Sequence, residues 1–181
     1  MNYHWTREFR TIYENALARY RQGRHRAQSL FEADEKQFLE SIGCTAQELF
    51  DFVEDFSRAQ EPDFETVLLI TAVRREYFLF EQHGVPSGKT ISMDNLPPKD
   101  TELGGIAWLP RIIQKAKAKL RGEMPSELMY GCGGDRPFLK SIDIHPADFL
   151  RLTWRTDGDE QEILASIRAS QQNEGDYCEL R

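Results

Sequence analysis

Two stretches of the chain match each other at a constant offset of one hundred residues. Residues 16–52 align with residues 116–152 without a gap, and several differences keep the charge or the apolar character, as in Leu49 and Phe149. The identical pairs are Ala16/Ala116, Ala18/Ala118, Arg21/Arg121, Phe38/Phe138, Leu39/Leu139, Ser41/Ser141 and Ile42/Ile142. Because repeated sequence units fold into repeated structural units, we predict two related halves. The alternative is a coincidence between two sequences of similar helical period.

Apolar residues recur every three or four positions in both halves, which is the spacing of α-helices. The predicted helices are 6–22, 33–42, a segment opened by the capping box Thr45 to Glu48, 62–84, 108–121, 135–142, a segment from Pro146 and a segment from Asp157. The apolar run 67–73 predicts a central helix, with a short buried strand as the alternative. The fold class is therefore all-α, a bundle of about eight helices in two pseudo-repeated halves.

A change of composition separates the two halves. Residues 85–105 contain prolines and glycines without an apolar period, which is typical of a connecting loop. We therefore divide the chain into an N-terminal helical half, 1–84, this loop, and a C-terminal helical half, 106–181.

Charge and composition exclude several classes of function. A formal net charge of -7 opposes broad binding to nucleic acids or to anionic membranes. No apolar run reaches the roughly 18 to 20 residues that cross a bilayer, and the first residues lack the apolar core of a signal peptide. The three cysteines, Cys44, Cys132 and Cys178, form no C-x-x-C pair, so we expect free thiols in a cytoplasmic protein without a structural metal or a cofactor.

A glycine-rich loop in the second half is the candidate site. The sequence MYGCGGDR, residues 129–136, leads into a predicted helix, and glycines let the backbone approach a bound group while a helix N-terminus favours an anion and a thiolate. The ligand-binding candidates are Tyr130, Gly131, Cys132, Gly133, Gly134, Asp135, Arg136, Arg111 and Lys115. The tryptophans, Trp108 among them, are spaced as core residues. No residue is assigned a catalytic role.

Three hypotheses follow for the function. The leading one is a non-catalytic binding or protein-interaction module with a small anionic ligand at loop 130–136. The alternative is a thiol-dependent enzyme or redox protein that uses Cys132, although no histidine is marked by the sequence as its base. The third is an acidic protein partner docked on the basic helix, whose lysines and arginines at 111, 115, 117, 119 and 121 are otherwise typical of a solvated face.

The second half also resembles a known family. The motifs that carry the resemblance are Leu109-Pro110-Arg111, Lys115-Ala116, Tyr130-Gly131-Cys132, Asp135 and Phe138-Leu139. Over roughly residues 95–170 the chain is similar to an uncharacterised bacterial domain-of-unknown-function family, the one numbered 5069. The resemblance implies a small bacterial helical protein and supplies no activity.

Overall fold

The computed structural model describes the backbone of residues 2–178 and the side chains up to residue 171. Over this range the chain forms nine α-helices, one short 3-10 helix and one two-stranded hairpin, in agreement with the all-α prediction. The elements are α1 (Trp5–Arg21), α2 (Ala27–Leu30), α3 (Ala33–Ser41), α4 (Ala46–Ala59), α5 (Phe64–Phe80), η1 (Met93–Asn95), β1 (Glu102–Leu103), β2 (Ile106–Ala107), α6 (Leu109–Arg121), α7 (Asp135–Ser141), α8 (Pro146–Arg155) and α9 (Glu160–Cys178). The sequence did not indicate α2, because a single turn is too short to show a period.

Local capping interactions explain where the helices begin. Thr45 accepts a hydrogen bond from the Glu48 backbone N–H (3.1 Å) and Glu48 accepts one from the Thr45 N–H (2.8 Å), which is the predicted capping box at the start of α4. Pro62 was wrongly predicted as the first residue of the next helix. That helix begins at Phe64, because the Asp63 side chain accepts a hydrogen bond from the Thr66 N–H (2.8 Å) and acts as the N-cap.

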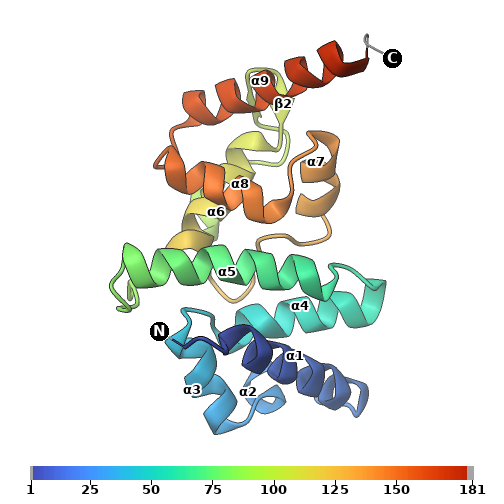
Figure 1. Cartoon of the computed structure of the whole chain (residues 1–181), viewed down its shortest axis with the longest axis vertical. Helices are drawn as coiled ribbons and strands as arrows, with labels where there is room; N and C mark the ends of the chain where they lie inside the picture. Colours follow the sequence, from blue (N-terminus) through green and yellow to red (C-terminus); the bar gives the residue numbers. More distant parts are fainter. Residues whose placement is uncertain (1, 179–181) are drawn as a thin grey trace.

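Helix α5 is the centre of the molecule. Figure 1 shows it crossing between α1–α4 on one side and α6–α9 on the other. It packs on α6 and α8 as well as on α1, and its apolar run 67–73 is helical rather than a strand. A helix that is apolar nearly all round needs such neighbours on several sides.

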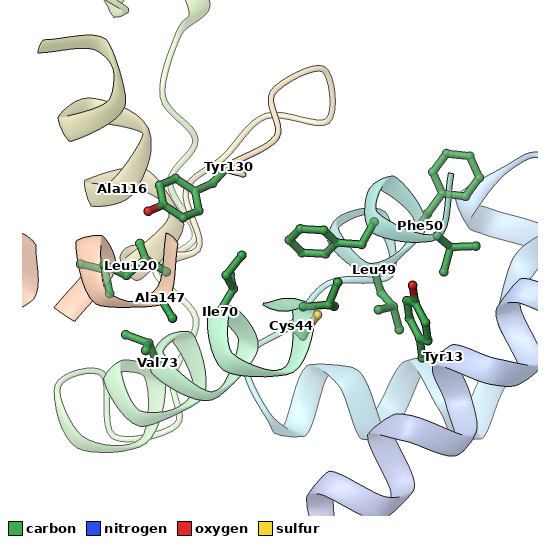
Figure 2. Close-up of a cluster of buried hydrophobic side chains, with 14 of the residues drawn as sticks. Tyr13, Cys44, Leu49, Phe50, Ile70, Val73, Ala116, Leu120, Tyr130 and Ala147 are labelled. Carbon is green, nitrogen blue, oxygen red and sulfur yellow. The ribbon is translucent and has the colours of Figure 1, made fainter. Parts of the chain in front are cut away.

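One hydrophobic core runs through both halves. In Figure 2, Ile70 of α5 lies between Leu49 of α4 and Ala116 of α6, and all three are fully buried. The described buried residues that form this single cluster range in sequence from Phe9 to Ile167. The packing therefore fixes α4 and α6 relative to each other. The division of the chain at residues 85–105 stays a prediction.

Some helices in the two halves end at positions one hundred residues apart, whereas the ends of α4 and α8 do not match. Helices α3 and α7 end at Ser41 and Ser141, and each serine donates a hydrogen bond to the carbonyl three residues earlier, at 2.6 Å in both cases. The duplication itself stays a prediction. The hairpin of β1 and β2 was not predicted, because two residues per strand give no alternating pattern.

Over the described residues, no helix combines the length and the apolar character that crossing a bilayer requires.

The central position of α5 makes a specific prediction. Replacing the fully buried Ile70 with alanine leaves a cavity between the two halves, so we expect a loss of about 2 to 5 kcal/mol in the free energy of unfolding. The neighbouring Leu69 is 42% exposed, and its replacement with alanine is the matched control, expected to cost less than about 1 kcal/mol. Urea denaturation measures both. Equal losses for the two variants would contradict the central role of α5.

Candidate functional site

A buried ion pair organises the glycine-rich loop. Asp135, the first residue of α7, is fully buried, and its carboxylate accepts hydrogen bonds from the Lys115 ammonium of α6 and from the Gly131 N–H (2.9 Å). The second carboxylate oxygen accepts a hydrogen bond from the Trp108 indole Nε1–H at 3.2 Å. Gly131 has a φ of +78°, a conformation in which a residue with a side chain would be strained. The loop is therefore held by hydrogen bonds to one carboxylate.

Trp108 occupies a backbone conformation that bulky residues rarely adopt. Its φ is +70°, in the left-handed region, at the N-cap of α6. The indole lies over Gly134, where an added Cβ would come within 2.9 Å of the ring. Strained residues of this kind concentrate at binding and catalytic sites, because the surrounding structure must hold them in place. Here the Asp135 hydrogen bond and the contact with Gly134 provide that support.

A cleft of about 400 Å³ opens beside the loop, between α4 and α6. Its lining residues come from α4, from the connection before α6, and from α6 and the loop: Asp51, Glu54, Asp55, Met93, Lys99, Trp108, Arg111, Lys115, Ser126, Glu127, Leu128, Met129, Cys132 and Gly134. The cleft thus has an acidic wall from α4, a basic wall from α6, and Trp108 with the loop at its base. Within the described chain, no three His, Cys, Asp or Glu side chains gather as a metal site.

The structure separates the nine predicted ligand residues into four groups. Arg111, Lys115, Cys132 and Gly134 all line the cleft. Gly131 and Asp135 lie behind it and position the loop, and Gly133 is exposed to solvent.

The other two predicted residues have structural partners. Tyr130 is 1% exposed and donates a hydrogen bond to the Pro146 carbonyl at 2.8 Å, so it anchors the loop on α8. Burial, with Asp135 and Asp148 nearby, raises the pKa of Tyr130 well above its ordinary value. Arg136 is paired with Asp55 at 2.8 Å, which joins α7 to α4.

The expectation of a solvated basic face on α6 was wrong for two of its lysines. Lys115 and Lys119 are each 2% exposed, because they face carboxylates across the interior of the molecule. Lys119 donates a hydrogen bond to Glu48 of α4 at 2.9 Å. Burial by itself raises the pKa of Glu48, but the Lys119 ammonium and the Thr45 N–H override it and hold this pKa below its ordinary value. Charge reversal at these lysines would break the core rather than test an acidic partner.

The two cysteines described by the structure differ in environment. Cys44 is 3% exposed, and burial raises the pKa of its thiol. Cys132 is half-buried, lines the cleft, and has its Sγ 3.4 Å from the Lys115 Nζ. None of the described residues lining this cleft is a histidine. Both cysteines are free thiols, as expected, and the Cys178 side chain lies outside the described residues.

A larger cleft of about 790 Å³ lies between the α4–α5 and α7–α8 connections, and it contains His145. Its central polar groups already have partners within the fold. The His145 Nδ1 accepts a hydrogen bond from the Ala147 N–H (3.2 Å), and the Asp63 side chain caps α5. We therefore assign the candidate site to the smaller cleft, where residues missed by the sequence analysis, above all Asp51 and Trp108, meet the predicted ones.

The family comparison covers the part of the chain that carries this loop. Residues 97–177 match the model of a family described as Domain of unknown function (DUF5069), which confirms the resemblance seen in the sequence. No curated protein and no solved structure matches the chain. The basic wall from α6 and the loop lie in the matched part, whereas the acidic wall from α4 lies outside it.

The buried ion pair makes a prediction about stability. Replacing Asp135 with asparagine leaves the Lys115 ammonium buried without a counter-charge, so we expect a loss of about 3 to 5 kcal/mol in the free energy of unfolding. Adding Lys115→Met to this variant removes the unpaired charge and should recover much of the loss. The exposed pair of Arg151 and Asp148 is the control, and Asp148→Asn should cost less than about 1 kcal/mol. Denaturation curves that place both aspartate variants within error of each other would contradict the prediction.

The acidic wall makes a prediction about pH. Burial raises the pKa of Asp51 to about 6, although the hydrogen bond from Gln47 and the charge of Lys119 oppose the shift. The negative charges of Glu48 and Glu54 raise this pKa further. Because an unfolded aspartate ionises near pH 4, the folded protein keeps a proton between about pH 4 and 6 that the unfolded chain releases. Asp51 therefore contributes stability at low pH that is lost as the pH rises through this window.

Asp51→Asn should remove this loss. The quantity to compare is the free energy of unfolding of the variant minus that of the unmodified protein. We expect this difference to be about 1 kcal/mol larger above pH 7 than near pH 4, after allowance for solvent screening of the half-buried carboxylate. Urea denaturation at the two pH values measures the difference. A difference between the two proteins that does not change with pH would show that Asp51 has an ordinary pKa.

Proposed function

We propose that the protein is a non-catalytic binding module of the cytoplasm that holds a small ligand with an anionic group in the cleft beside loop 130–136. The carrying observation is Trp108, whose strained backbone and fixed indole present an aromatic surface to this cleft. Arg111 and Lys99 supply positive charge at the same cleft. Lys115 contributes less, because Asp135 already neutralises it.

A thiol-dependent function of Cys132 is the second candidate. It is favoured by one observation, the hydrogen bond from the Lys115 ammonium to the Cys132 sulfur at 3.4 Å. A thiol nucleophile also needs a group that accepts its proton, and the Lys115 ammonium, paired with Asp135, is a donor. The binding module requires no chemistry at this sulfur, so the two candidates differ in their tolerance of Cys132→Ser.

The experiment uses the tryptophan indole N–H signals in NMR spectra during titration with a panel of small carboxylates and phosphates. We expect a binding compound to shift the Trp108 signal and to leave the signals of Trp5 and Trp154, which do not line the cleft, in place. Trp108→Phe should weaken binding about tenfold, and Cys132→Ser should change it by less than about threefold.

Two results would overturn the proposal. A panel in which no compound shifts the Trp108 signal leaves the cleft without a ligand. A compound that is converted, or that forms an adduct with Cys132 and is lost in Cys132→Ser, identifies the thiol-dependent function instead.

A further inference from the structure

The cleft contains charges that the fold itself uses and charges that it does not. On the acidic wall, Asp55 is paired with Arg136 at 2.8 Å and Glu54 with Arg58 at 2.8 Å. On the basic wall, Lys115 is paired with Asp135. These three cleft residues contribute little free charge to a ligand, because a neighbouring opposite charge already compensates each of them.

Asp51 is the carboxylate of the acidic wall that has no cation of its own. Its hydrogen bond comes from the neutral amide of Gln47, at 2.7 Å, and no ion pair joins it to another described residue. It is nevertheless half-buried, with its side chain at the cleft between the helices. A half-buried carboxylate without a counter-charge gains most from a ligand that brings a cation.

The corresponding cations are Arg111 of α6 and Lys99 of the connection before α6. Arg111 donates a hydrogen bond to the Pro97 carbonyl at 2.8 Å, and the Lys99 Nζ lies 5.6 Å from the centre of the Trp108 ring. Among the residues that the structure describes, neither forms an ion pair with a carboxylate. Arginine in particular has further N–H donors that suit a carboxylate.

Apart from the exposed Ser126 and Glu127, the remaining surface of the cleft is largely apolar. Trp108, Met93, Leu128 and Met129 contribute aromatic and aliphatic surface. The volume of about 400 Å³ lies at the small end of the range for ligand pockets. A ligand that fits must therefore be compact and carry an apolar body beside its charged groups.

We propose that the cleft binds a small zwitterion of the apolar α-amino acid class. Its ammonium group pairs with Asp51, its carboxylate pairs with Arg111 and Lys99, and its side chain packs on Trp108. This inference rests on the proposed binding function and narrows the class of ligand. A simple anion would leave the Asp51 carboxylate without a partner and would be repelled by its negative charge.

Three related compounds test the role of each charge. L-phenylalanine carries both charges, N-acetyl-L-phenylalanine lacks the ammonium, and L-phenylalaninamide lacks the carboxylate. We expect L-phenylalanine to bind at least about tenfold more tightly than either analogue, measured by calorimetry and by the Trp108 indole signal.

Two variants assign the charges to residues. Asp51→Asn should abolish the preference for L-phenylalanine over N-acetyl-L-phenylalanine. Lys99 is exposed, and Lys99→Gln should reduce the preference for L-phenylalanine over L-phenylalaninamide. Asp34→Asn is the control, because this exposed carboxylate of α3 does not line the cleft, and it should change neither preference.

The outcomes separate this inference from the function on which it rests. If the N-acetyl compound binds as tightly as L-phenylalanine, the ligand is a simple anion, and the inference fails while the cleft remains a binding site. If L-phenylalanine, L-leucine and L-methionine leave the Trp108 signal unchanged while another compound of the wider panel shifts it, the amino acid class is wrong. If no compound at all shifts the signal, the proposed function fails as well.

Discussion

The ion pair of Lys115 and Asp135 is the interaction on which the candidate site depends. A buried pair of this kind loses its hydration, and it is tolerated only where further hydrogen bonds satisfy the remaining polar atoms. Here the Gly131 N–H and the Trp108 indole N–H donate the further hydrogen bonds that the Asp135 carboxylate needs. The same hydrogen bonds fix the loop, the indole and the neighbouring Cys132. The site is thus a consequence of how one buried charge is satisfied.

A polar contact in the first half resembles this arrangement but includes an exposed residue, Asn15. Asn15 and Glu35 stand one hundred residues before Lys115 and Asp135, and the Asn15 amide lies 3.4 Å from the Glu35 carboxylate. Glu35 is paired with Arg19, which is partly exposed. In the second half the lysine is buried, because α5 and α8 both pack on α6. The contact of the first half is therefore only partly buried, since Glu35 is buried and Asn15 is exposed, whereas the contact of the second half lies in the interior.

Much of the helical framework could be predicted, and about half of the site. Helix starts follow from local signals such as Thr45 with Glu48. Arg111 and Cys132 were both named as ligand-binding candidates, and the structure places both at the cleft. The burial of Lys119 could not be predicted, since periodicity tells which residues share a stripe but not what faces that stripe. Asp51 was missed for the same reason: no local signal shows that the outer face of α4 meets a loop eighty residues later. The left-handed conformation of Trp108 also has no sequence signal, because it is imposed by tertiary contacts.

The continuity of the core limits how the proposed site can work. Ile70 of α5 is buried between the helices that form the two walls of the cleft. Lys119 and Glu48 join these walls a second time, through a largely buried ion pair. A hinge motion of α4 relative to α6 that closed the cleft would have to separate packed side chains and paired charges, or slide them past one another. Recognition in the proposed site therefore depends on the charges and the shape already present between α4 and α6. It follows that changes of Asp51 or Arg111, which take no part in satisfying the buried ion pair, should alter which ligand is preferred without altering the fold that presents them.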